Sequence, residues 1–410
     1  MTTRIPARLM VLLSVLAVVG PSSMELYLPT LPEVSDTLGL SDTQAAWSLL
    51  GCLLGLAVGQ VLWGPVADRI GRRPTVLVGL VAWTAVSVGC AVVEDPVAFI
   101  VLRVCQGLAG ACGLTVSRAV LADLLDPGAL ARPLARLMLL TAAFTILSPV
   151  IGGVLLSVTD WRGVFWILVV AGALVVAWTA LGLAESRPAR PSVTGPRPAG
   201  ERLLTDAPFA LATLTSGLAF AAVIVFVTFS PEVLRGEYGQ GSLAFGVSFA
   251  AVAVAMVTGA QASPRLLERV PAERLVVVAL GAGVGVQLTL AAVAAAWGGL
   301  PPLGVTLALF FASNLCLGVA MPLGAAAALA GRTARAGTAS GLVGGLQFGL
   351  GAVVGLVVAP LHPGGLAATA IAMALTGLAG VLAWTTRVRL LARADGTGTG
   401  LPVPAAGADV

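Results

Sequence analysis

Residues 64–74 read Gly-Pro-Val-Ala-Asp-Arg-Ile-Gly-Arg-Arg-Pro. This basic stretch joins two apolar segments, residues 45–65 and 74–93, which each have the length of about 20 residues that crosses a bilayer. Its glycines permit a tight turn and a close approach of two helices, and Asp68 among three arginines can form a charge cluster. The composition alone would fit any short basic loop between membrane spans, but the spacing favours a more specific role.

The apolar pattern around this stretch continues along the chain. Of 410 residues, 58% are hydrophobic and only 10% are charged, and the mean hydropathy is +1.00. Ordinary soluble domains have about 25% charged residues, so the sequence predicts a polytopic membrane protein. The twelve predicted spans are residues 9–29, 45–65, 74–93, 97–122, 134–157, 162–184, 207–229, 242–262, 273–296, 302–329, 337–360 and 366–387.

The positive charges are sorted between the two sides of these spans. Every basic residue is an arginine; Arg103 and Arg118 lie inside the fourth span, and Arg162 and Arg235 lie in odd-numbered loops. All the others fall in the even-numbered loops or the tails, and such an excess marks the cytoplasmic side. We therefore expect both termini in the cytoplasm, with the protein in a bacterial inner membrane, and we read the positive charge as orientation rather than as a nucleic-acid site.

The chain divides into two halves. Residues 185–206 are polar and rich in proline, which is typical of a linker, and the pair Asp68-Arg69 recurs as Glu268-Arg269 at an offset of 200 residues. We predict an all-α integral membrane fold, with six-helix bundles at 1–184 and 207–393 and a disordered tail at 394–410. We expect a monomer.

The spacing of residues 64–73 closely resembles the G-x-x-x-D-R-x-G-R-R signature of the major facilitator superfamily, whose fold has two six-helix halves. In that family the loop latches the halves in the outward-facing state. The resemblance implies this gating role for Gly64, Asp68, Arg69, Gly71, Arg72 and Arg73. It also implies that Asp123, at the cytoplasmic end of the fourth span, pairs with Arg69 or Arg72.

Glu25 is the carboxylate placed well inside an apolar segment, and such a residue normally faces a cavity or a partner. Arg103 lies at a similar depth, about 10 Å from the outer side against about 6–10 Å for Glu25. Burial and a neighbouring guanidinium have opposite effects on the charge of a carboxyl. We expect Glu25 and Arg103 to couple transport to protons; the alternative for Arg103 is that it only extends to the interface.

Residues 103–111 also resemble the R-x-x-Q-G-x-G motif of proton-coupled members of this superfamily, with Ala109 in place of the last glycine. Arg118 lies some 22 Å further along the same helix. We expect Arg118 to belong to the cytoplasmic gate.

Residues 148–153, Ser-Pro-Val-Ile-Gly-Gly, resemble the G-P-x-x-G-G motif of exporters, without its leading glycine. Pro149 followed by Gly152 and Gly153 gives a bent helix with a smooth face for close packing. An ordinary small-residue helix interface is the alternative. The order of the motifs along the chain favours export over import.

Residues 25–32, Glu-Leu-Tyr-Leu-Pro-Thr-Leu-Pro, look like the D-M-Y-L-P-A-L-P element of Bcr/CflA-type drug-resistance transporters, with glutamate in place of aspartate. Residues 229–234 and 336–342 resemble the same group. This resemblance implies proton-coupled antiport of small amphipathic compounds or antibiotics. The candidate pocket residues are Tyr27, Trp47, Gln106, Phe220, Phe226, Asn314 and Gln347.

Several functions remain as alternatives. The chain is a candidate for a dedicated exporter of one metabolite, or for an uncoupled facilitator in which Glu25 binds a cationic substrate. A membrane enzyme usually needs paired acids, histidines or metal ligands, whereas this chain has one histidine and no clustered buried acids. A non-transporting scaffold would leave Glu25 and Arg103 unexplained. Without lysine there is no ATP-binding P-loop, and we expect no cofactor and no metal.

Overall fold

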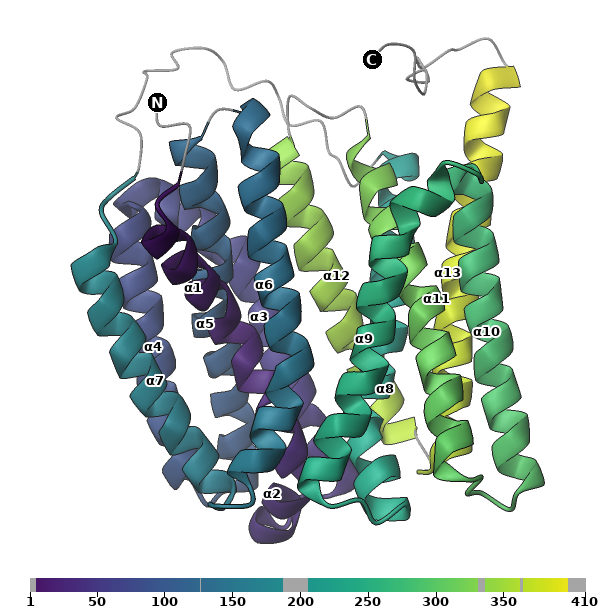
Figure 1. The fold of residues 1–410 in the computed structure, drawn as a ribbon, viewed down its shortest axis with the longest axis horizontal. Helices are drawn as coiled ribbons and strands as arrows, with labels where there is room; N and C mark the ends of the chain where they lie inside the picture. Colours follow the sequence, from purple (N-terminus) through teal and green to yellow (C-terminus); the bar gives the residue numbers. More distant parts are fainter. Residues whose placement is uncertain (1–4, 126, 187–205, 331–335, 362–363, 397–410) are drawn as a thin grey trace.

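The computed structural model describes residues 5–125, 127–186, 206–330, 336–361 and 364–396, and these are helical, with no strand (Figure 1). Helices satisfy their backbone hydrogen bonds internally, as a membrane requires. Eleven of the described helices are long and apolar enough to cross a membrane, and α6 contributes a shorter apolar stretch, Leu139–Leu155. These helices correspond to the twelve predicted spans, so the predicted fold class is confirmed.

The helices pack in two groups, which lie side by side in Figure 1. The first group consists of α1 (Ala7–Glu25), η1 (Leu28–Thr30), α2 (Leu31–Leu38), α3 (Asp42–Ile70), α4 (Arg72–Val92), α5 (Pro96–Leu124), α6 (Pro127–Leu155) and α7 (Trp161–Gly182). The second consists of α8 (Ala207–Pro231), the π-helical turn η3 (Glu232–Glu237), α9 (Ser242–Leu267), α10 (Ala272–Ala296), α11 (Leu303–Leu329), α12 (Ala336–Val358), η5 (Ala359–Leu361) and α13 (Leu366–Gly396). Most of the linker predicted at 185–206, and the tail beyond residue 396, lie outside the described residues.

The first predicted span is broken rather than continuous. The helix α1 ends at Glu25, and the chain passes through η1 before α2 begins at Leu31. Pro29 and Pro32 lack the backbone N–H that a continuing helix would use. Glu25 therefore lies in the last turn of α1, directly before an irregular segment.

The loop expected between the spans 45–65 and 74–93 is almost entirely helical, so that expectation is wrong. The helix α3 continues through Pro65 to Ile70, and α4 begins at Arg72. Gly71 alone makes the turn, with a φ of 106° that favours glycine. The ion pair between Asp68 and Arg72, at 2.6 Å, connects the end of one helix to the start of the next.

Glycines bring α3 and α5 into close contact. A Cβ atom on Gly55 would lie 2.7 Å from the backbone nitrogen of Leu108, and one on Gly107 would lie 3.0 Å from that of Leu56. The second group repeats this contact between α9 and α11, where a Cβ atom on Gly259 would lie 3.0 Å from the nitrogen of Val319. Small residues allow membrane helices to pack backbone against backbone.

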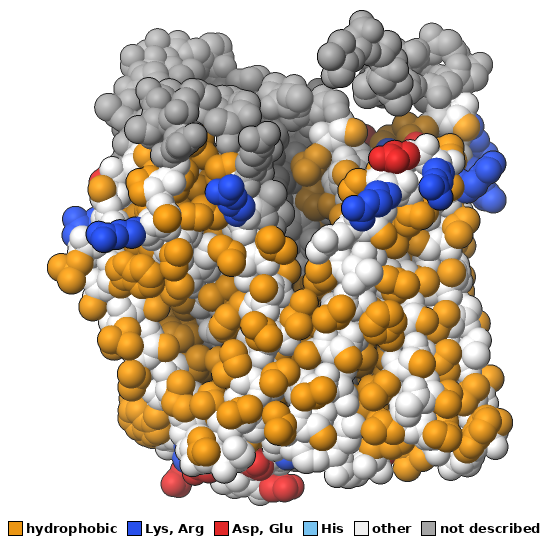
Figure 2. Space-filling view, viewed as in Figure 1, with side chains coloured by type: hydrophobic (Ala, Val, Ile, Leu, Met, Phe, Trp, Pro, Cys, Tyr) orange, Lys and Arg blue, Asp and Glu red, His pale blue; other side chains and the backbone are white. Residues whose placement is uncertain are grey.

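The two groups meet along α3 and α12, and they also meet at the end of the molecule opposite the termini. A Cβ atom on Gly153 of α6 would lie 3.0 Å from the Cα of Leu243 on α9. Nearby, Arg235 of η3 donates a hydrogen bond to the carbonyl of Pro29. Figure 2 shows arginines gathered around the other end. The halves are thus closed at one end.

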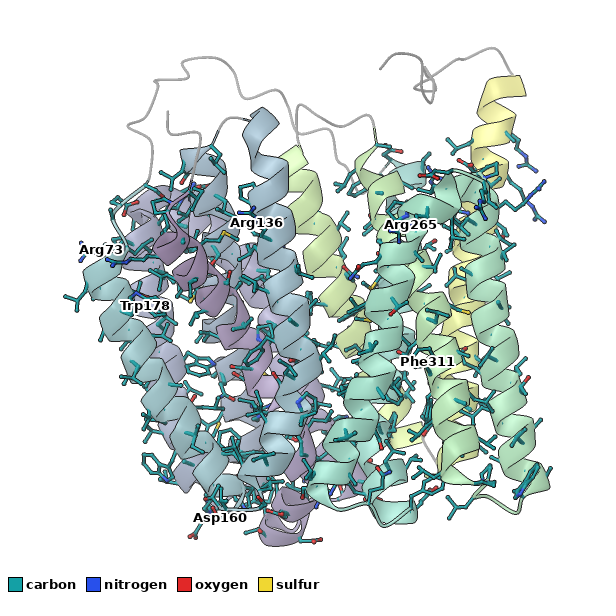
Figure 3. All side chains as sticks on the ribbon, in the orientation of Figure 1. Arg73, Arg136, Asp160, Trp178, Arg265 and Phe311 are labelled. Atoms are coloured by element: carbon teal, nitrogen blue, oxygen red, sulfur yellow. The ribbon has the colours of Figure 1, made fainter. Side chains whose placement is uncertain are left out.

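The arginine pattern has a structural counterpart. Figure 3 shows Arg73, Arg136 and Arg265 towards the end that carries the termini, and Asp160 at the opposite end. The two arginines of the odd-numbered loops both bind backbone carbonyls. Arg162 donates to those of Ala91 and Val93 at the end of α4, at 2.9 and 3.1 Å, and Arg235 donates across the two groups.

We expect Arg235→Ala to loosen the closed end, because it removes a charge-assisted hydrogen bond between the two groups. Spin labels at Asp36→Cys and Gly241→Cys, in a chain with its native cysteines replaced by alanine, report the separation across this end. The fraction of molecules with a longer distance between the two spin labels should rise. Arg162→Ala is the matched control, because the carbonyls that Arg162 binds lie in its own half, and it should leave the distances unchanged. Equal effects of both variants would contradict the prediction.

Candidate functional site

Arg103 lies in the core of the first group and is fully buried. Its guanidinium carbon is 4.2 Å from the centre of the Tyr27 ring and 5.7 Å from that of Phe165, distances typical of cation–π contacts. Its Nε donates to the carbonyl of Ser48 at 3.3 Å. The alternative that Arg103 reaches out to the membrane interface is therefore wrong for this conformation.

Gln106 and Tyr27, both predicted as pocket residues, hold Arg103 in place. Gln106 accepts a hydrogen bond from Nη1 of Arg103, and its own amide donates to Ser87 at 2.8 Å. The hydroxyl of Tyr27 is hydrogen-bonded to that of Ser48 at 2.6 Å. Both side chains are buried, so neither offers a free surface to a substrate in this conformation.

Glu25 faces α6 rather than Arg103. Thr145 and Ser148 lie beside its carboxyl group, and its Oε2 atom is buried with no hydrogen-bond partner. None of the ion pairs found among the described residues joins Glu25 to Arg103. The structure thus places Glu25 beside α6 and Arg103 over Tyr27, and it does not join the two predicted coupling residues in an ion pair.

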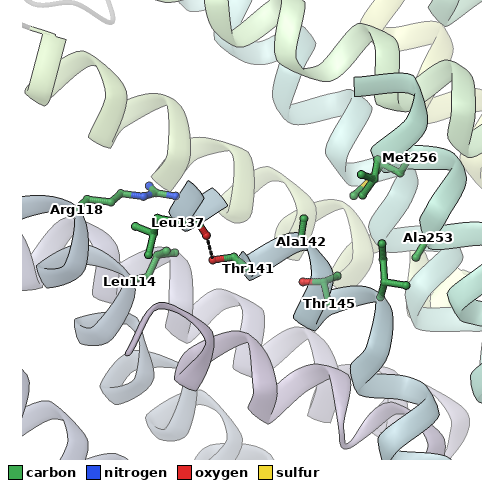
Figure 4. A pocket seen from close by; sticks show the side chains of 10 residues that line it. Leu114, Arg118, Leu137, Thr141, Ala142, Thr145, Ala253 and Met256 are labelled. Carbon is green, nitrogen blue, oxygen red and sulfur yellow. Dashed lines mark hydrogen bonds between the residues drawn. The ribbon is translucent and has the colours of Figure 1, made fainter. Parts of the chain in front are cut away.

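A cavity of about 200 Å³ opens between the two groups, next to the Glu25 site. Thr145 belongs both to the surroundings of Glu25 and to the wall of this cavity. Figure 4 shows that the side chains of the cavity wall come from α5, α6 and α9. The lining residues are Leu114, Arg118, Leu137, Thr141, Ala142, Thr145, Ile146, Ala253, Met256 and Val257. Of the predicted site residues, only Arg118 is among them.

The exporter motif on α6 packs against two different partners. A Cβ atom on Gly152 would lie 2.8 Å from the carbonyl of Leu26 and 3.1 Å from Pro29. On the opposite side, a Cβ atom on Gly246 of α9 would lie 2.5 Å from the carbonyl of Pro149. Because Gly152 and Gly246 have no side chains, α6 can lie against both the break after α1 and the other half of the protein.

The basic stretch at residues 68–73 forms a network at the other end of the first group. Arg72 binds Asp123 through Nε at 2.8 Å and Nη2 at 3.3 Å, in addition to Asp68. Arg72 is one of the two partners that the resemblance implied for Asp123. Gly64 of the same motif has open space around it.

Glu185 is a part of this network that sequence reasoning missed. Its carboxylate accepts hydrogen bonds from the backbone N–H groups of Arg72 and Arg73, at 2.9 and 3.2 Å. An acidic group at a helix N-terminus is favourable, and Glu185 supplies it from 113 positions further along the chain. Because these contacts are made by backbone N–H groups, the side-chain pattern at 69–73 gave no signal for Glu185.

The remaining predicted pocket residues are dispersed over the second group and α3. Phe226 is buried between Phe249 and Phe310, at 5.5 and 4.8 Å between ring centres. Phe220 packs against Phe348 at 5.1 Å. Asn314 donates to the carbonyl of Phe310 in its own helix, at 3.0 Å. Trp47 is exposed and Gln347 is half-buried, so these residues do not form one site here.

The chain is similar to several known transporters. It is 29% identical to the multidrug resistance protein MdtL of Klebsiella pneumoniae over 354 residues, which cover 83% of this chain and 87% of that one. It is 26% identical to a bicyclomycin resistance protein homolog of Haemophilus influenzae over 364 residues, covering 85% and 88%. These relatives agree with the resemblance to Bcr/CflA-type proteins.

Solved structures support the fold. A D-xylose-proton symporter superimposes with a TM-score of 0.73 at 15% identity, covering 92% of this chain and 97% of that one. The nucleoside transporter NupG gives a TM-score of 0.69 at 14% identity, covering 93% and 99%. The model of the Major Facilitator Superfamily matches residues 13–356. The chain therefore belongs to the Major Facilitator Superfamily.

Proposed function

We propose that this transporter exports small amphipathic compounds in exchange for protons, by alternating access. The observation that carries the proposal is the carboxyl group of Glu25, which has one buried oxygen without a partner and lies beside a wall residue of the cavity. The relatives named for multidrug and bicyclomycin resistance favour antibiotics among the exported compounds. Membership of the superfamily makes the protein a membrane transporter of small molecules and not an enzyme.

In the proposed cycle, Glu25 is ionised and paired with Arg103 in the outward-facing state. A proton from outside neutralises Glu25, which releases Arg103 and lets the halves close at the outer end. The described conformation is closed at the end opposite the termini, and its Arg103 lies over Tyr27 instead of pairing with Glu25. These contacts support the assignment of this conformation to the protonated, inward-facing part of the cycle.

Substrate then enters the cavity from the cytoplasm or the inner leaflet and favours release of the proton inward. With one such carboxyl group, we propose about one proton per cycle. The membrane potential supplies about 2.3 kcal/mol per 100 mV for each elementary charge that moves across the membrane. The halves 1–184 and 207–393 would move as two units, and the gating network around Arg72 would form and break between the states.

The proposed orientation has both termini in the cytoplasm of a bacterial cell, with the protein as a monomer in the inner membrane. Its support is the gathering of arginines at the end that carries the termini (Figures 2 and 3), because cytoplasmic loops are rich in basic residues. The closed end then faces outward, and the cavity faces the cytoplasm.

The test is uptake of uncharged, non-titrating antibiotics into proteoliposomes with an acidic lumen. A proton antiporter should accumulate at least one compound above its equilibrium concentration, and a protonophore should abolish the accumulation. A facilitator would only equilibrate the compound, and a dedicated exporter would accumulate one substrate and ignore the panel. Uptake that does not respond to the pH gradient would argue against proton coupling.

A further inference from the structure

The wall of the cavity beside Glu25 is mostly apolar. Seven of its ten lining side chains are apolar, and the polar ones are Arg118, Thr141 and Thr145. Figure 4 shows Arg118 extending from α5, with Thr141 and Thr145 on α6 and Met256 on α9. An apolar wall with a few polar groups is typical of a small-molecule site, where the polar groups determine orientation and specificity.

Arg118 has no ion-pair partner among the described residues, and its Nε atom is buried without a hydrogen-bond partner there. The other arginine of this helix, Arg103, is held by Tyr27 and Gln106. A charge inside a membrane protein normally pairs or faces a functional cavity, so Arg118 leaves the cavity with an unmatched positive charge.

The threonines extend the polar side of the cavity towards Glu25. Thr141 donates its hydroxyl proton to the carbonyl of Leu137 at 2.9 Å, which leaves its oxygen as an acceptor. Thr141, Thr145 and Ser148 follow one another along one face of α6 over roughly 10 Å. A cation thus lies in the wall of the cavity, and a carboxyl group lies beside the wall residue Thr145.

We propose that this cavity recognises amphipathic anions: a carboxylate or similar group binds the guanidinium of Arg118, and the apolar body packs against Leu114, Ile146 and Met256. This inference rests on the proposed export function and names its substrate class. The anion supplies the missing partner of Arg118, while Glu25 keeps its role as the proton carrier. A cationic substrate would place a like charge beside Arg118.

The test compares three ligands with the same body and different charge: phenylbutyrate, phenylbutanamide and phenylbutylamine. Binding to purified full-length protein in neutral detergent is measured by isothermal titration calorimetry. We expect the acid to bind at least about tenfold more tightly than the amide, which corresponds to about 1.4 kcal/mol, and the amine to bind most weakly. Equal affinities of acid and amide, or tighter binding of the amine, would overturn the inference without any variant.

Two variants assign the preference to Arg118. Arg118→Gln should reduce the ratio of acid to amide affinity to near one, and Arg118→Lys should restore part of it. Binding of phenylbutanamide reports that each variant is folded. Arg162→Ala changes a different arginine, outside the cavity and bound to carbonyls of its own half, and should retain the wild-type ratio. A preference that survives in Arg118→Gln would show that another group binds the acid.

An anionic lipid headgroup has the same chemistry as the ligand that we propose. Repeating the titration with phosphatidylglycerol in the micelles separates the two sources. A substrate site should keep its preference for phenylbutyrate. If the lipid abolishes that preference, the assignment to exported compounds is overturned. Failure of the acid preference, with gradient-driven uptake of neutral antibiotics intact, rejects this inference alone. Absence of gradient-driven uptake for every compound rejects the proposed function itself.

Discussion

Glu25→Gln is expected to abolish proton release driven by transported compounds. The glutamine keeps the shape of the side chain beside Thr145 and Ser148, but it has no proton to exchange. When a transported compound is added to detergent-solubilised wild-type protein, the weakly buffered medium should become more acidic. The variant should give no signal, while still binding the compound.

Glu33→Gln is the matched control for this experiment. Glu33 is a half-buried carboxylate of α2, eight positions further along the chain and beyond the break. It lies within electrostatic reach of Arg235 rather than beside the cavity. We expect its variant to release protons as the wild type does. Undiminished release from Glu25→Gln would remove Glu25 as the proton carrier.

Gly107→Ala is expected to destabilise the whole first half. A Cβ atom at this position would overlap the backbone carbonyl of Cys52 and lie 3.0 Å from the nitrogen of Leu56. Backbone atoms cannot rotate away as a side chain does, so α3 and α5 must separate. Overpacking of this kind costs about 1–3 kcal/mol or more, and the melting temperature in detergent should fall by several degrees.

Gly64→Ala provides the comparison, because it makes the same chemical change at a motif glycine with no atom within 4 Å of the new methyl group. Its melting temperature should stay within about one degree of the wild type, as is usual for unconstrained surface changes. Alanine favours a helix more than glycine does, so similar losses in both variants would mean that the contact with α3 does not explain the effect of Gly107.

Most of the fold follows from hydropathy and charge. Apolar segments of spanning length and sorted arginines predicted the twelve helices, because a bilayer imposes both patterns. The exceptions have local causes. Prolines at 29 and 32 end α1 early, and a single glycine with a positive φ replaced the loop expected between the spans 45–65 and 74–93.

The site was less predictable, because depth along a helix does not determine the direction of a side chain. The sequence predicts a similar depth for Glu25 and Arg103, yet one lies beside Thr145 and the other lies over Tyr27. Glu185 reaches the start of α4 from the far end of α7, and no spacing rule relates the two positions. The cavity wall combines α5, α6 and α9, and this combination arises only from the packing of the two halves.

The hydrogen bond from Arg235 to the carbonyl of Pro29 has a consequence for mutational robustness. Its two partners differ in how a point substitution can affect them. Any residue at position 29 still has a carbonyl, so most substitutions there leave an acceptor in place, whereas nearly every substitution at position 235 removes the donor. Random mutagenesis selected for altered outer closure should therefore yield variants of Arg235 far more often than variants of Pro29.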